Sequence, residues 1–231
     1  LRARGVPTRR ATAEARGRLE QIGLLELAGR RPSQLSGGQA QQVAVARALA
    51  TEPRLLLLDE PMAALDVDVA PALREQLRRF LDDRTALVVS HDVLDAMTLG
   101  LTLAVLEAGR LVEHGPVLEV LSRPRSAFAA RFAGLNLLTG RWDGRAVSLN
   151  TGQQLLVDTS MGQPPGAPVH AAFRPSAVRI LGSAPMPPHA TRLRRSVSAL
   201  QPLGDLVRVR AGDLTADVTP QQVAELQLQP G

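Results

Sequence analysis

Three short stretches of this sequence place polar residues where a phosphate group could be recognised. The first is LSGGQ at residues 35–39, in which Ser36 and two glycines precede an apolar pattern of helical spacing. The first backbone N–H groups of a helix lack partners within the helix and carry a partial positive charge. Glycines let an anion approach that backbone closely, and a serine hydroxyl can donate to a phosphate oxygen. The stretch therefore suits a phosphate, although an ordinary helix capped by Ser36 explains it equally well.

The second stretch, LLLLDEP at residues 55–61, follows an apolar run with two adjacent carboxylates, Asp59 and Glu60. Such a run favours a strand buried on both faces of a parallel sheet. Ligands of open α/β sheets bind at the carboxyl ends of the strands. At that place Asp59 can hold Mg²⁺, directly or through water, and Glu60 can orient or deprotonate a water molecule. The alternative is a solvated turn after a core strand.

The third stretch is VVSHD at residues 88–92, where His91 follows another apolar run. A histidine at the end of a strand can donate to a terminal phosphate and respond to its loss. A lone histidine is more often structural, but the two preceding stretches favour the phosphate-binding interpretation.

Alternating helical and strand-like patterns surround these residues and indicate an α/β layer structure. Gly29 and Pro53 are expected to end the first two helical units. The predicted helices span residues 10–28, 37–50, 71–80 and 92–99, and the predicted strands span residues 55–58, 86–89 and 103–106.

The pattern changes after about residue 135, where Gly, Pro and Thr become frequent and long helical periodicity disappears. Short alternating segments predict a small β region, and residues 183–188 resemble a linker that divides it. The predicted strands span residues 146–149, 155–157, 169–173, 178–181, 206–209 and 214–218.

Composition narrows the class of protein further. The 231 residues are 45% hydrophobic, which allows one large domain or two modest ones. There is no cysteine, so disulfides and thiolate metal sites are excluded. No apolar run approaches the ~18 residues that a membrane span requires. The net charge is +5, but the 27 basic residues, all Arg, are scattered and aromatic residues make up only 2%, so we expect no nucleic-acid partner.

In this order and spacing, LSGGQ, LLLLDEP, AALD at residues 63–66 and VSHD resemble the nucleotide-binding subunit of an ABC transporter. The resemblance covers roughly residues 1–125. It implies a partial P-loop-type ABC ATPase domain that binds ATP and Mg²⁺ and works as a homodimer. It also implies that the signature contacts the γ-phosphate of ATP held by the other protomer, through Ser36, Gly37, Gly38 and Gln39.

The same resemblance assigns a role to each of the other polar residues. Asp59 is the Walker B carboxylate that holds Mg²⁺, and Glu60 is the catalytic carboxylate that polarises the attacking water. Asp66 belongs to the loop that touches the opposite protomer, and His91 is the switch histidine. The family also needs a phosphate loop, G-x-x-x-x-G-K-[ST], which this lysine-free sequence does not contain. We expect that Walker A loop to precede Leu1, and we expect the chain alone to be inactive.

Residues 115–140 resemble the exit from the ATPase domain of importers that carry a C-terminal regulatory domain, with residues 126–140 as the linker. Residues 141–231 resemble a small all-β domain (OB-like, of the Mop or TOBE type), and the part from about 189–231 resembles the oxyanion-binding domain of molybdate importers. Hydroxyl groups and arginines suit a tetrahedral dianion. The candidate residues are Thr191, Arg194, Arg195 and Ser196, and the alternative is a solvated edge strand.

Together these features predict an ABC-type ATPase subunit that energises the uptake of molybdate or a similar oxyanion. The implied partners are a second copy of the chain, membrane permease subunits and, indirectly, a periplasmic or lipid-anchored binding protein. The implied location is peripheral, at the cytoplasmic face of the cell membrane. Three alternatives remain: a non-catalytic remnant, an ATPase subunit for sulfate or a sugar, and an intracellular oxyanion-binding module.

Overall fold

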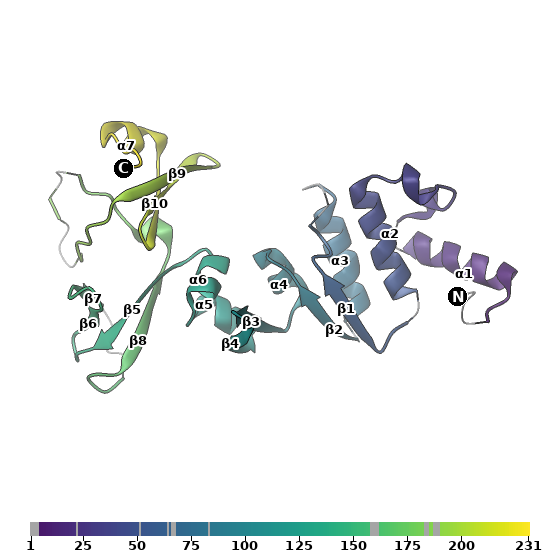
Figure 1. Cartoon of the computed structure of the whole chain (residues 1–231), viewed down its shortest axis with the longest axis horizontal. Helices are drawn as coiled ribbons and strands as arrows, with labels where there is room; N and C mark the ends of the chain where they lie inside the picture. Colours follow the sequence, from purple (N-terminus) through teal and green to yellow (C-terminus); the bar gives the residue numbers. More distant parts are fainter. Residues whose placement is uncertain are drawn as a thin grey trace. The chain divides into compact units, whose positions relative to one another are not determined.

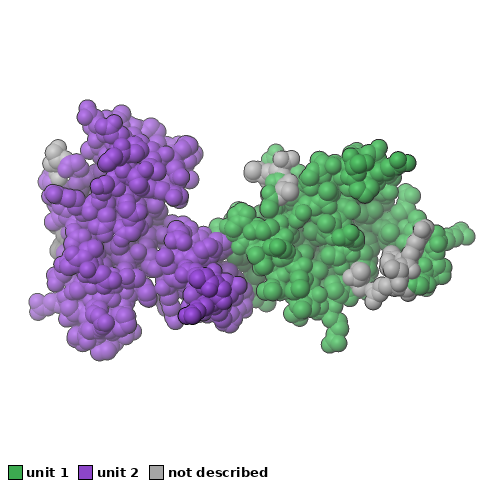
Figure 2. Space-filling model, in the orientation of Figure 1, with its two compact units in different colours: residues 1–101 green, residues 102–231 purple. Residues whose placement is uncertain are grey.

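The computed structural model describes residues 5–21, 23–50, 52–63, 65, 68–82, 84–157, 162–182, 185–186 and 190–231. The chain forms two compact units, residues 1–101 and residues 102–231 (Figure 2). Within the part of the chain that the structure describes, no helix has both the length and the apolar character that crossing a bilayer requires.

Unit 1 has α/β architecture, as the sequence predicts, with two parallel strands packed against helices (Figure 1). β1 and β2 pair in register from Leu55 opposite Thr85 to Asp59 opposite Val89. One core cluster joins the strands to their covering helices through Val45, Leu49, Leu56, Leu58, Met62, Leu73 and Leu77. The elements are α1 (Thr8–Gln21), the 3-10 helices η2 (Leu25–Leu27) and η3 (Pro32–Gln34), α2 (Gly37–Leu49), β1 (Leu55–Asp59), α3 (Ala70–Leu81), β2 (Thr85–Val89) and α4 (Val93–Leu99).

The first predicted helix, residues 10–28, is wrong at its carboxyl end. α1 ends at Gln21, and Gly23 follows with a φ of +68°. The N–H of Leu24 donates to the carbonyl of Leu19 at 2.7 Å, and the N–H of Gly23 donates to the carbonyl of Glu20 at 3.0 Å. This pair of bonds is the Schellman motif that ends helices at a left-handed glycine. The stop is therefore Gly23, and the 3-10 helix η2 supplies the apolar residues beyond it.

The prediction that residues 55–58 are buried on both faces is also wrong. Leu56 and Leu58 are buried in the core cluster, whereas Leu55 and Leu57 are 54% and 66% exposed. On β2 the side chains of Leu87 and Val89 are exposed as well. Successive side chains of a strand point to opposite faces, so the helices of unit 1 cover one face and leave the other open.

Unit 2 begins with the β3–β4 hairpin and continues into two antiparallel sheets, one of four strands and one of three (Figure 1). The strand orders are β7-β6-β5-β8 and β11-β10-β9. The elements are β3 (Thr102–Glu107), β4 (Arg110–Pro116), α5 (Val117–Ser122), α6 (Ala127–Phe132), β5 (Asn136–Trp142), β6 (Ala146–Leu149), β7 (Gln154–Leu156), β8 (Pro168–Phe173), the 3-10 helix η4 (Pro175–Ala177), β9 (Val197–Leu203), β10 (Leu206–Ala211), β11 (Leu214–Val218) and α7 (Pro220–Glu225).

Most of the β segments predicted from alternation are strands, but residues 178–181 are not. Val178 and Ile180 instead pack against the cluster formed by β10 and β11, so their alternation reflects burial without strand pairing. Strands β4, β5 and β9 are present although the alternation pattern did not predict them. Residues 126–140 contain α6 and the first part of β5.

One buried side chain links the two sheets of unit 2. Asn136 at the start of β5 is 3% exposed, and its amide forms hydrogen bonds with Thr215 on β11. Its Nδ2 donates to the Thr215 carbonyl at 2.8 Å, and its Oδ1 accepts from the Thr215 N–H at 2.7 Å and hydroxyl at 3.0 Å. The asparagine thus pairs with a strand backbone as another strand would.

Candidate functional site

The LSGGQ stretch forms the amino-terminal cap of α2. Ser36 has extended backbone angles, and its Oγ accepts from the Gln39 N–H at 3.2 Å. The Gln39 side chain accepts in return from the Ser36 N–H at 3.1 Å, which completes a capping box. Ser36 and Gly37 are exposed, and a Cβ added at Gly37 meets nothing within 4 Å. The cap therefore leaves open space beside the first turn, where an anion could approach the backbone.

Glu60 lies immediately after β1 and has a φ of +46°, which is rare for a residue other than glycine. Its N–H donates to the Val89 carbonyl at 2.9 Å, and its carbonyl accepts from Gln41 Nε2 on α2 at 3.3 Å. Both backbone polar groups are thus held by neighbouring elements. Such a backbone conformation costs about 1–3 kcal/mol and persists only when its surroundings impose it. The two hydrogen bonds hold the Glu60 backbone in place and tie it to α2, the helix that carries the capped glycines.

The parallel pairing of β1 and β2 brings Glu60 and His91 together. The imidazole Nδ1 of His91 lies 2.6 Å from Oε2 of Glu60. The hydrogen bond to Glu60, together with its charge, raises the pKa of His91 above its ordinary value. The His91 side chain is 74% exposed, so the second ring nitrogen can reach a ligand. A carboxylate in this position can accept a proton from water. The adjacent imidazolium can donate a hydrogen bond to a phosphate oxygen.

A buried ion-pair network that the sequence analysis did not predict supports the segment around His91. Arg74 on α3 is 9% exposed, and its Nε donates to Oδ1 of Asp95 on α4 at 2.8 Å. Its Nη2 also donates to Oδ2 of Asp92 at 3.1 Å. Arg74 is one of many arginines in the sequence, and its partners lie 18 and 21 residues away, so no local pattern marks it.

The structure gives partial information on the remaining ATPase candidates. Asp59 ends β1 and is exposed, while Asp66 lies outside the described residues. No group of three or more His, Cys, Asp or Glu side chains in the described ranges is arranged to hold a metal ion. Mg²⁺ at phosphate sites is often held by one or two carboxylates together with water and substrate phosphates. A single carboxylate at the end of β1 fits that requirement.

The oxyanion candidates in unit 2 do not all converge on one point. Thr191, Arg194 and Arg195 line a cavity of about 410 Å³, whereas Ser196 is exposed and lies outside its lining. The Thr191 hydroxyl accepts from the Leu156 N–H at 2.9 Å. Arg195 Nε donates to Oδ1 of Asp213 at 2.6 Å, so this guanidinium already has a carboxylate partner.

Two further arginines line the same cavity, Arg179 and Arg192. Arg179 is not among the residues predicted from the sequence, because it follows η4 and lies in a different segment from residues 191–196. Arg179 and Thr191 also line a neighbouring cavity of about 680 Å³, whose lining includes residues of β6, β7, β8 and β11. Arginine side chains around the cavity of about 410 Å³ could form charge-assisted hydrogen bonds with an anion.

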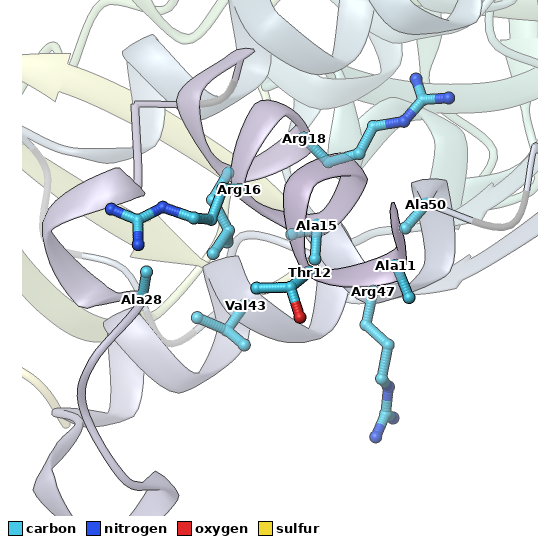
Figure 3. Close-up of a pocket in the computed structure, with 11 residues that line it drawn as sticks. Ala11, Thr12, Ala15, Arg16, Arg18, Ala28, Val43, Arg47 and Ala50 are labelled. Carbon is cyan, nitrogen blue, oxygen red and sulfur yellow. The ribbon is translucent and has the colours of Figure 1, made fainter. Parts of the chain in front are cut away.

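A third cavity, of about 540 Å³, lies between α1 and α2 (Figure 3). Small side chains form its floor, and the guanidinium groups of Arg16, Arg18 and Arg47 point outward in different directions around it (Figure 3). Arg18 is paired with Glu52.

Comparison with known proteins places this sequence in a family. A profile described as ABC transporter matches residues 3–63, which include the capped glycines and Glu60. The molybdate/tungstate import ATP-binding protein WtpC of Pyrococcus horikoshii is 32% identical over 100% of this chain and 68% of its own length. The chain belongs to the ABC transporter family.

Other members of the ABC transporter family are similar over much of the chain. The molybdenum import ATP-binding protein ModC of Mycobacterium tuberculosis is 39% identical over 96% of this chain, which spans 63% of ModC. The sulfate/thiosulfate import ATP-binding protein CysA 1 of Chromobacterium violaceum is 41% identical over 83% of this chain and 52% of its own length. The names of these relatives give different substrates, so members of the family differ in what they import.

Proposed function

We propose that this chain is part of the ATP-hydrolysing subunit of an ABC importer for molybdate or a similar oxyanion. The observation that carries the proposal is the contact between Glu60 and His91 at the carboxyl ends of two parallel strands. The same site is tied through Gln41 to α2, the helix that begins with the family signature. The names of the relatives support import, and two of those compared above name molybdenum or molybdate.

Each residue then has a task in ATP hydrolysis. Glu60 orients the attacking water and accepts its proton, while His91 donates to the γ-phosphate from its exposed ring nitrogen. Asp59 would hold Mg²⁺, which neutralises charge on the phosphate oxygens when it is bound.

The signature acts across a dimer of two such subunits. The backbone N–H groups of Gly37 and Gly38, with Ser36, contact the γ-phosphate of ATP on the second copy. Gln39 keeps Ser36 in place through the capping box. Asp66 lies in the loop that faces that second copy.

Residues 1–125 are proposed as the ATPase part, residues 126–140 as the connection, and residues 141–231 as an OB-like regulatory part of the Mop or TOBE type. The proposed oxyanion site of this regulatory part involves Thr191, Arg194, Arg195 and Ser196. The cavity lined by the first three of these residues supports that site. The subunit would work as a homodimer on membrane permease subunits at the cytoplasmic face.

The catalytic proposal is tested by substituting Glu60 in the complete gene product. We expect Glu60→Gln to retain ATP binding and to slow turnover at least about 100-fold, because the amide cannot take the proton from water. Glu75→Gln, on the exposed side of α3, is the matched control and should keep turnover. Undiminished turnover in Glu60→Gln refutes the role of Glu60. Absence of ATP binding by the gene product refutes the ATPase and leaves the non-catalytic alternatives.

The oxyanion-binding module is a second candidate function, favoured by the arginine-lined cavity. Calorimetric titration of this chain with molybdate, tungstate and sulfate measures anion binding directly. We expect saturable heat with at least one anion and at least about tenfold weaker binding in Arg194→Gln, because a charge-assisted hydrogen bond is lost. Arg110→Gln, on exposed β4, is the control. If none of the three anions gives binding heat, the hypothesis of an oxyanion-binding module is refuted.

A further inference from the structure

The proposed mechanism uses His91 but leaves unexplained how an exposed imidazole is aimed at Glu60. The His91 side chain is 74% exposed, so packing against neighbours does little to orient it. Apart from the hydrogen bond to Glu60 itself, its direction depends on the backbone on either side, at Ser90 and Asp92.

Both neighbours of His91 are tied to one buried ion pair. Ser90 Oγ donates to Oδ2 of Asp95 at 2.7 Å and accepts from the Asp92 N–H at 3.1 Å. The carboxylate of Asp92 caps α4 by accepting from the Leu94 N–H at 2.8 Å, and it also accepts from Arg74. Asp95 is 2% exposed, and Arg74 contacts it through two nitrogens, at 2.8 Å from Nε and 2.7 Å from Nη2.

We propose that Arg74 and Asp95 are positioning residues that hold the Ser90–Asp92 segment so that His91 meets Glu60. The inference rests on the proposed role of His91 and extends it to two residues that touch neither Glu60 nor the imidazole in the contacts described above.

The network joins α3, α4 and the turn before α4 through several hydrogen bonds that share the same side chains. A planar guanidinium fits two carboxylates at once only when α3 and α4 are correctly placed, and the shared Ser90 hydroxyl then fixes the turn between β2 and α4. Removing the cation leaves Asp95 as an uncompensated buried charge, and either protonation of Asp95 or a movement of the segment toward water breaks the present arrangement of hydrogen bonds. Such a movement carries His91 away from the end of β1.

The test measures the titration of the His91 imidazole by NMR in this chain, in metal-free buffer. The charged groups around it are Glu60 from the end of β1, Asp92 and Asp95 beside it, and Arg74 from α3. In Arg74→Met, the loss of a positive charge and the loss of position change the His91 pKa in opposite directions. Loss of a nearby positive charge alone favours the imidazolium and raises the His91 pKa further. Loss of position removes the Glu60 contact and lowers the pKa toward the ordinary value of about 6.5.

We expect the His91 pKa to fall in Arg74→Met and also in Ser90→Ala, which changes no charge and removes only the hydroxyl. Arg79→Met is the control, because Arg79 pairs with Glu75 on the exposed side of the same helix. A pKa that rises or stays unchanged in folded Arg74→Met overturns the proposal. If Arg74→Met does not fold, Ser90→Ala decides, and an unchanged pKa there overturns it. None of these measurements involves ATP, so failure of the catalytic proposal is detected separately by the Glu60→Gln experiment.

Discussion

Replacing Asn136 by Ala should lower the stability of unit 2 by more than the loss of one ordinary hydrogen bond. The substitution removes three hydrogen bonds and leaves the N–H and the carbonyl of Thr215 without their partners. A buried polar group without a hydrogen-bond partner costs about 1–3 kcal/mol. Because Thr215 is only half-buried, water can replace some of the lost hydrogen bonds and reduce that cost. We therefore expect a loss of about 2–4 kcal/mol in the free energy of unfolding.

Urea unfolding followed by tryptophan fluorescence provides the assay. Trp142 is the single tryptophan of the chain, lies on the same strand as Asn136 and is 5% exposed. With a urea dependence of about 2 kcal/mol per molar, the midpoint should fall by about 1–2 M. Thr215→Val is the matched control, because it removes only the hydroxyl bond and should cost about 1 kcal/mol or less. A midpoint for Asn136→Ala within about 0.3 M of the parent refutes the reasoning.

Three further substitutions test other parts of the fold. Gly140→Ala should cost about 1–3 kcal/mol in urea unfolding followed by Trp142 fluorescence, because its Cβ would lie 2.5 Å from the Ser148 carbonyl oxygen; unchanged stability contradicts that close approach. Leu77→Ala should cost about 2–5 kcal/mol by circular dichroism, since the side chain is 0% exposed; a loss below about 1 kcal/mol contradicts it. Hydrogen bonding to Arg208 lowers the pKa of Asp217, so this pair stabilises the fold above the ordinary carboxyl pKa and the contribution disappears as pH falls through the lowered value. Asp217→Asn should therefore destabilise the protein at about pH 6 and have less effect near pH 2, as urea midpoints at the two values will show; an equal effect at both contradicts the assignment.

Local chemistry explains the parts of unit 1 that sequence reasoning could predict. A serine before two glycines marks the start of a helix, and α2 begins after Ser36 as expected. The parallel β1–β2 pair follows from two short apolar runs separated by a helix, and parallel pairing brings Glu60 and His91 to one edge. Their 2.6 Å contact was not predicted from the sequence, because it also depends on the side-chain conformations of the two residues.

The missed features depend on contacts between distant residues or on exceptions to local preference. Arg74 gains its importance only when α3 and α4 pack, which no spacing in the sequence reveals. Strands β5 and β9 contain Gly140 and Pro202, respectively, and both residue types lower strand propensity. The two segments were therefore not predicted as strands from their sequences. Gly140 is tolerated because the neighbouring strand approaches too closely for a side chain.

The open face of the β1–β2 pair would couple the stability of unit 1 to any protein layer that covers it. Leu57 and Leu87 are 66% and 59% exposed on that face, although parallel strands are normally covered on both sides. A protein layer that covers these side chains binds the folded unit and not the unfolded chain. At a free concentration 100 times its dissociation constant, such a layer adds about 2.7 kcal/mol. An unfolding free energy measured in the presence of such a layer would depend on its concentration, so those values are comparable only at equal concentrations of the layer.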